Sequence, residues 1–265
     1  MREYLPYVTT FVVVEADRTF SGDLKPTVFS DNRDRFDSLL DGSGAKIIYH
    51  KVTGLSKNLE KGSFDNERLM RNTVGEILTA LDIPIGSLII QSDVDEIISG
   101  PTLDLLSSCY GYESTLHLNV DNYRYGFNFP VPDGGYWRPH ILTTDNTTVG
   151  YHHGRGSNTL LPGSGWHCSF CFPTLEEMRR KMLGYSHNDR VRDPSILEEV
   201  SLRERVCKGE DPFQMWPKAH TFKDLITQSG SIKPSHSFTN VPVALQQEPT
   251  RFGYLLNDGC DRPDK

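Results

Sequence analysis

The chain has 265 residues and a mass of 30.0 kDa, with 28 basic against 35 acidic residues and a formal net charge of −7 at pH 7. That length is enough for one sizeable core with elaborations. It contains no run of about 18 apolar residues, which excludes a transmembrane helix within these residues. The acidic balance gives no electrostatic reason to expect a nucleic-acid partner.

Strand and helix signals alternate through the first half of the chain. The continuous apolar runs at residues 11–14 and 88–91 predict strands buried on both faces, as in a parallel sheet, and residues 46–52 predict another strand. Apolar residues recur with helical spacing over residues 66–81, with Ser63 and Asp65 as possible caps. A short helix is expected from residue 101 and an alternating strand over residues 115–120.

The second half has weaker signals. Residues 121–165 are rich in Gly, Pro, Asn and aromatic residues, which indicates irregular structure, with hairpins around residues 133–135 and 154–156. Helical spacing returns at residues 175–182 and 196–206, and a polar tail follows. We therefore expect one α/β domain over residues 1–265 with a mostly parallel sheet flanked by helices, and a ligand bound beyond the carboxyl ends of the strands.

Three acids follow the third apolar strand directly. Asp93 and Asp95 are two residues apart, so in an extended chain their side chains point to the same side, and Glu96 comes next. Two such carboxylates can hold a hard divalent cation together with a phosphate, and the cation would neutralise a leaving diphosphate. The alternative is an acidic turn that merely ends the strand. This placement is the one expected of Asp-x-Asp sugar-nucleotide transferases.

The segment Gly-Trp-His-Cys-Ser-Phe-Cys-Phe at residues 165–172 allows four interpretations. In the first, Cys168 and Cys171 are half of a zinc site, although the chain has no second cysteine pair with zinc spacing. In the second, they are a redox dithiol, although the strand-to-helix context of such dithiols is missing. Trp166 and His167 are suited to a sugar site, with an apolar ring face and a proton-accepting group. The fourth is a packed core segment with buried cysteines. The chain has five cysteines, so at least one is unpaired within it.

Three motifs in this order resemble glycosyltransferase family 17. They are Phe-Val-Val-Val-Glu-Ala at residues 11–16, Ser-Asp-Val-Asp-Glu-Ile at residues 92–97, and the segment at residues 165–172. Further matches are Glu67 with Arg71 and Asn72, residues 185–190, residues 207–209, residues 220–223 and residues 251–256. The resemblance spans nearly the whole chain, and the last of the three motifs is the most specific.

The resemblance implies a GT-A-like nucleotide-diphospho-sugar transferase that inverts the anomeric carbon. Animal members move N-acetylglucosamine from the UDP-sugar to the β-linked mannose of an N-glycan core. By this resemblance Asp93 and Asp95 would hold Mn²⁺ or Mg²⁺, and Glu15 would contact uracil or ribose. Arg71 would face the diphosphate, since a guanidinium pairs well with phosphate. The alternative for Arg71 is a surface or helix-pairing charge.

Inverting transfer needs a general base for the acceptor hydroxyl. The candidates are His167, Asp189, His187 and Glu96, and the acceptor-side position favours His167 or Asp189. The candidate sugar platforms are Trp166, Trp137 and Tyr123, with core packing as the alternative role of each.

The resemblance also divides the domain into a donor and metal half over about residues 1–120, an acceptor half over about 121–226 and a wrapping tail over 227–265. Its implied partners are a UDP-sugar and a glycan or glycoprotein acceptor. Two competing functions are another metal-dependent nucleotide-phosphate enzyme and a non-catalytic carbohydrate-binding protein. The first is disfavoured because no Gly-x-x-x-x-Gly-Lys-Ser/Thr loop is present.

The expected compartment is the Golgi lumen, by the same resemblance. The sequon at Asn146 and a possible Cys168–Cys171 disulfide agree with a lumenal site. No signal peptide is visible in these residues. Family members carry a strand before the segment that matches residues 1–7, so we expect a sheet short of one strand, with that strand and any membrane anchor upstream.

Overall fold

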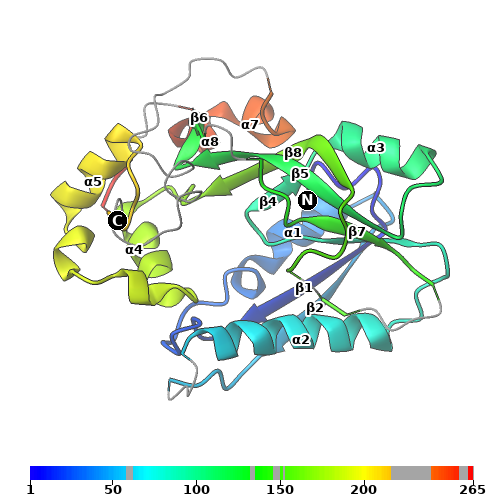
Figure 1. The fold of residues 1–265 in the computed structure, drawn as a ribbon, viewed down its shortest axis with the longest axis horizontal. Coiled ribbons are helices and arrows are strands. Elements are labelled where there is room, and N and C mark those ends of the chain that lie inside the picture. The colour runs from blue at the N-terminus through cyan, green and yellow to red at the C-terminus, as the bar shows by residue number, and fades with distance from the viewer. Residues whose placement is uncertain are drawn as a thin grey trace.

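The computed structural model describes residues 1–57, 62–131, 135–145, 150–151, 153–215, 240–256 and 262–264. Within them the chain folds as a mixed α/β protein in which helices flank the sheets (Figure 1). None of the described helices is long and apolar enough to cross a membrane. The strands are β1 (Thr10–Ala16), β2 (Lys46–Val52), β3 (Leu88–Gln91), β4 (Glu96–Ile98), β5 (Thr115–Arg124), β6 (Gly126–Pro130), β7 (His140–Thr143) and β8 (Leu160–Ser169). The α-helices are α1 (Arg33–Leu40), α2 (Phe64–Ala80), α3 (Gly100–Ser108), α4 (Leu175–Gly184), α5 (Glu199–Lys208), α7 (Val243–Gln247) and α8 (Pro249–Phe252), with short 3-10 turns η1 (Ser30–Asn32), η2 (Asn188–Arg190), η3 (Pro194–Leu197) and η4 (Gly253–Leu255).

The strands form two sheets, and the expectation of a mostly parallel sheet is wrong. β1 and β2 pair in parallel as a two-stranded sheet. The larger sheet has the order β3-β7-β5-β8-β4, with β6 also paired to β5, and in it only β5 and β8 run parallel. Parallel neighbours need a long crossover, and α1 supplies one between β1 and β2. Between β5 and β8 there is no described helix. The chain instead passes through β6 and β7, which both pair with β5, before β8 runs parallel to β5.

β1 is also less buried than its apolar sequence predicts. Every residue of β1 except Ala16 is partly exposed. The reason is that, among the described strands, β1 has a partner on one side only, β2. β3 likewise pairs with β7 alone of the strands described, and both β1 and β3 line the large cleft of the molecule. The expected additional strand stays a prediction.

Local sequence signals located several elements correctly. β2 and β3 occupy the residues expected, and α2 begins directly after Ser63. The Ser63 hydroxyl does not cap this helix, however, but donates to Asn188 Oδ1 at 2.9 Å. The expectation of irregular structure over residues 121–165 is wrong for part of that range, because β6, β7 and the start of β8 lie there. Their short, Gly- and Pro-interrupted runs carry little periodicity, and pairing with β5 defines them.

Three apolar clusters pack the helices against the larger sheet. α3 covers one part, where Leu103 and Leu106 meet Leu118 of β5. α4 and α5 bury Met178 and Leu202 in a second cluster, which forms the lobe at the far end of the sheet from α3 (Figure 1). The described part of the tail, α7 to η4, packs on β6 and β8 in the third. α2 lies along the β1–β2 pair (Figure 1).

Candidate active site

The acidic segment forms a tight turn between two strands. β3 ends at Gln91 and β4 begins at Glu96. The backbone N–H of Asp93 donates to Glu96 Oε2 at 2.8 Å, and the N–H of Glu96 donates to the Asp93 carbonyl at 3.0 Å. Glu96 lies directly opposite His167 in the antiparallel pair of β4 and β8. Two residues distant in sequence are thereby fixed beside each other.

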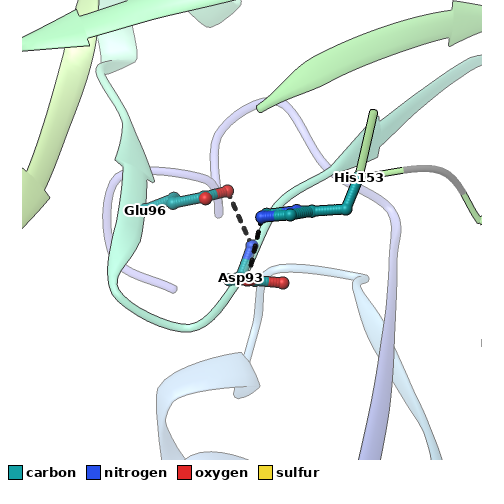
Figure 2. Close-up of side chains that lie close together, drawn as sticks. All are labelled: Asp93, Glu96 and His153. Atoms are coloured by element: carbon teal, nitrogen blue, oxygen red, sulfur yellow. Dashed lines mark hydrogen bonds and ion pairs between the residues drawn. The ribbon is translucent and has the colours of Figure 1, made fainter. Parts of the chain in front are cut away.

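Asp93, Glu96 and His153 converge as a possible cation site. One ligand atom from each lies within 4.8 Å of the others, and Figure 2 shows Glu96 and His153 approaching Asp93 from two sides. His153 Nε2 is 3.7 Å from Asp93 Oδ2. Glu96 is only 3% exposed, and its Oε1 has no hydrogen-bond partner among the residues that the structure describes. A buried carboxylate oxygen without a donor is costly unless a cation or proton reaches it, so these residues fit a divalent ion with mixed O and N ligands.

Two groups of the cluster have shifted pKa values. Burial raises the pKa of Glu96 to about 8, and the neighbouring charge of Asp93 adds to the shift. The Tyr136 hydroxyl interacts with the Glu96 carboxyl and opposes the shift, but it forms no hydrogen bond to Oε1. Burial also lowers the pKa of His153, although Asp93 opposes this. A neutral His153 has a free lone pair, which a metal ligand requires.

Arg71 of α2 lies against this cluster. Its guanidinium bonds Glu67, one helical turn earlier, at 2.7 Å and reaches Asp93 at 3.4 Å. It also lies over the ring of Tyr151, 5.1 Å from the ring centroid, and the Tyr151 hydroxyl donates to Asp93 Oδ1 at 2.8 Å. Arg71 therefore pairs within its helix and also faces the acidic turn. Its contact with a diphosphate stays a prediction.

Asp95 has a different set of partners from Asp93. The chain turns at residues 94–95, so it is not extended there, and the Asp95 carboxylate takes another direction. Its Oδ2 accepts a hydrogen bond from Lys181 of α4 at 2.8 Å and lies 3.9 Å from His167 Nε2. Burial raises the pKa of Asp95, but Lys181 and His167 outweigh this and leave it lowered. Asp95 is outside the three-residue group around Asp93, and its role as a metal ligand stays a prediction.

His167 is held as a neutral imidazole at the cleft. Its Nδ1 bonds Asn122 Oδ1 at 2.8 Å, and its ring stacks on Tyr136 with centroids 3.9 Å apart. With Nδ1 donating to an amide oxygen, the lone pair lies on Nε2. Burial lowers the pKa of His167, while Asp95 opposes that shift. His167 can therefore accept a proton at neutral pH, and Asp95 would stabilise the resulting charge.

Of the other candidate bases, Glu96 lies in the acidic turn, whereas Asp189 and His187 lie elsewhere. Asp189 is exposed on η2 and does not line the cleft. His187 lines the cleft, and its ring meets the edge of Phe64 with centroids 4.8 Å apart. Burial lowers the pKa of His187. Neither has a described contact with the acidic turn.

Glu15 holds local structure at the carboxyl end of β1. Its two carboxylate oxygens accept from the backbone N–H groups of Phe29 and Ser30 at 3.0 and 3.2 Å, and the Tyr49 hydroxyl donates to it at 3.3 Å. These bonds organise the turn that leads into α1. Glu15 also lines the cleft, and its contact with uracil or ribose stays a prediction.

The candidate sugar platforms differ in exposure. Trp166 is 5% exposed, packs in the cluster under α7, and donates its indole N–H to the Asn240 carbonyl at 3.0 Å. Trp137 and Tyr123 are half-buried and line the cleft. Arg138 lies over the Trp137 ring, 5.0 Å from its centroid. Trp137 and Tyr123 thus offer more ring surface than Trp166, and contact with an acceptor stays a prediction for all three.

The cysteines favour a structural role. Cys168 and Cys171 form a disulfide, with Cα atoms 5.7 Å apart, so they are not zinc ligands in this structure. Cys207 is also disulfide-bonded, and Cys109 is free and exposed.

Sequence reasoning missed several residues of the site: Tyr136, Tyr151, His153 and Lys181. All but Lys181 lie in the stretch expected to be irregular, and none has a spacing that links it to Asp93. Tertiary packing brings them to the acidic turn, and for Lys181 this is the docking of α4.

This cleft gathers carboxylates, neutral imidazoles and cationic side chains at the strand ends of an α/β protein, an arrangement suited to an enzyme that acts on a phosphorylated ligand. Residues 1–263 match the model of glycosyltransferase family 17. The chain belongs to this family and is a glycosyltransferase. Searches of curated proteins and of solved structures found no match.

Proposed function

We propose that the protein is a metal-dependent, inverting transferase that moves N-acetylglucosamine from UDP-N-acetylglucosamine to a mannose of an N-glycan core in β-1,4 linkage. The supporting observation is the cluster of Asp93, Glu96 and His153 with the neutral His167 beside it. Membership of family 17 supports the sugar transfer, and the resemblance of the motifs supports the donor, acceptor, linkage and GT-A-like arrangement.

The residues of the cluster fit a resident Mn²⁺ or Mg²⁺. Asp93, Glu96 and His153 would hold it, because Glu96 Oε1 is buried without a donor from the described part of the chain and the His153 pKa is lowered. A bound divalent cation would neutralise charge on the leaving diphosphate. Arg71, already at 3.4 Å from Asp93, would bind the same diphosphate through its guanidinium.

His167 is the proposed general base. Its Nε2 would take the proton of the acceptor hydroxyl as the oxygen attacks the anomeric carbon, and Asp95 Oδ2 at 3.9 Å would stabilise the imidazolium. The hydrogen bond from Nδ1 to Asn122 keeps Nε2 free for this role. Trp137 and Tyr123 would bind sugar rings at the cleft wall, and Glu15 would bind the nucleoside.

We place the protein in the Golgi lumen by the resemblance to family members. The Cys168–Cys171 disulfide supports an oxidising compartment, since such bonds are rare where thiols are kept reduced. The sequon at Asn146 lies outside the described residues.

The test is a transfer assay with Mn²⁺ and a panel of nucleotide sugars, in which UDP release is measured with and without an N-glycan core. UDP release from UDP-N-acetylglucosamine that depends on Mn²⁺ and on the glycan is expected, with a β-linked product by NMR. His167→Asn should lower kcat at least about a hundredfold, whereas Asp189→Asn should leave kcat within a few-fold. The proposal fails if no UDP-sugar releases UDP and UDP binding does not depend on metal. Release of pyrophosphate would instead indicate a nucleotidyltransferase.

A further inference from the structure

Each of the two aspartates in the acidic turn contacts a positively charged side chain. Arg71 of α2 lies on Asp93, and Lys181 of α4 bonds Asp95. The backbone of Asp95 is held as well, because its carbonyl accepts from the N–H of Cys168 at 3.0 Å. The two carboxylates therefore belong to different sets of contacts, although they are only two residues apart.

Lys181 is fixed in position by aromatic rings and by the end of its helix. Its Nζ lies 5.2 Å from the centroid of Phe170 and 5.8 Å from that of Phe172. Phe170 has a positive φ of 58° and lies between the two cysteines of the disulfide, which hold this unusual backbone. One turn after Lys181, the Gly184 carbonyl accepts from the N–H of Phe20 at 2.8 Å.

The ammonium group of Lys181 still has capacity to bind a ligand. It carries three N–H donors, and within the described part of the chain the bond to Asp95 Oδ2 is its one hydrogen bond. Lys181 lines the same cleft as Asp93 and Glu96. Asp95 Oδ2 lies between Lys181 and His167, at 2.8 Å from Lys181 Nζ and 3.9 Å from His167 Nε2.

We propose that Lys181 binds the diphosphate of the nucleotide-sugar donor and that Asp95 is its positioning residue rather than a ligand of the metal. This rests on the proposed function. Phosphate oxygens are acceptors for the remaining N–H groups of Lys181, and the resulting charge-assisted bonds are strong. Arg71 and Lys181 then hold the diphosphate from two sides of the acidic turn, and Asp93 remains for the cation.

The experiment measures binding rather than turnover. The affinities for UDP and, by competition, for uridine are measured calorimetrically with Mn²⁺ present, in the wild type, Lys181→Met and Lys181→Arg. Lys208→Met, which removes an exposed lysine of α5, is the control for the loss of one positive charge. The affinity for Mn²⁺ alone is measured by electron paramagnetic resonance in Asp93→Asn, Asp95→Asn and Lys181→Met.

Lys181→Met should weaken UDP binding at least about tenfold and leave uridine unchanged, with Lys181→Arg retaining most of the affinity. Asp95→Asn and Lys181→Met should keep Mn²⁺ affinity, which Asp93→Asn loses. If Lys181→Met does not fold, because Asp95 is left without its partner, the double variant Lys181→Met, Asp95→Asn gives the same comparison.

Provided that the wild type binds both UDP and Mn²⁺, two results would overturn the inference. One is an unchanged UDP affinity in Lys181→Met. The other is a loss of Mn²⁺ affinity in Asp95→Asn that is as large as the loss in Asp93→Asn. A wild type that binds neither UDP nor Mn²⁺ would contradict the proposed function itself.

Discussion

Gly165 permits the closest approach between β8 and β4, and Gly165→Ala is expected to disrupt it. Its φ is +150°, and an added Cβ would lie 2.0 Å from the Ile97 carbonyl oxygen and 2.8 Å from Ile98 Cα. Ordinary contact begins at 3.4 Å, so β4 would have to retreat by about 1.4 Å. The atoms that the added methyl group would meet belong to the backbone of β4, which cannot rotate away as a side chain can. Glu96, the first residue of β4, would move with its strand.

The cost has two parts. Forcing a side chain into a filled space costs about 1–3 kcal/mol, and an L-residue at positive φ adds about 1–2 kcal/mol. The sum is about 2–5 kcal/mol, and for a domain of this size each kcal/mol lowers the Tm by about 2–4 °C. A fall of about 10 °C is therefore expected, together with weaker Mn²⁺ binding, because Glu96 leaves its place beside Asp93.

Gly163→Ala is the matched control. Gly163 lies two residues earlier in β8 at φ +65°, and no atom of the described residues lies within 4 Å of a Cβ added there. Gly163→Ala has the conformational cost alone, about 1–2 kcal/mol, which lowers the Tm by a few degrees. Thermal unfolding of both variants at one pH, followed by circular dichroism, gives the comparison. If Gly165→Ala melts no lower than Gly163→Ala, the argument from the strand contact is refuted.

Three further changes have defined outcomes. Thr174→Ala removes the hydroxyl that accepts from the Glu177 N–H at the start of α4, and should cost about 1 kcal/mol in denaturant unfolding, whereas an unchanged midpoint would show that the cap contributes nothing. Met178→Ala empties a fully buried position and should cost about 2–5 kcal/mol; a loss below 1 kcal/mol would mean that the cluster under α4 is loosely packed. The Nε2 of His117 accepts from the Gly156 N–H, and burial lowers the pKa of this histidine. The contribution of neutral His117 to stability is therefore complete above pH 6.5 and is lost as the pH falls below that value. In His117→Gln the Tm should therefore fall less steeply from pH 6.5 to 5 than in the wild type, and equal slopes would contradict the assignment.

Local pattern was enough to locate part of the site. The apolar run of β3 followed by Asp93, Asp95 and Glu96 identified the acidic turn, and the segment around His167 was recognised from its unusual composition. Both are features of a few consecutive residues, which the sequence displays directly. The resemblance to family 17, carried by the same motifs, agrees with the family match over residues 1–263.

The sequence could not show which side chains meet. Asp93 and Asp95 were expected on one side of an extended chain, but the turn at residues 94–95 sends them to different partners. His153 is 60 residues from Asp93 in a stretch without periodicity, and it reaches the cluster only through the arrangement of the larger sheet.

By itself, then, the sequence determined the α/β class, the acidic turn and the family, because these depend on short motifs and on local periodicity. The tertiary structure decided the antiparallel pairing of β4 with β8, which places Glu96 opposite His167, and the docking of α4, which places Lys181 on Asp95. Such contacts join residues that are tens of positions apart, and their energy arises from burial and charge pairing in three dimensions, which no window of the sequence contains.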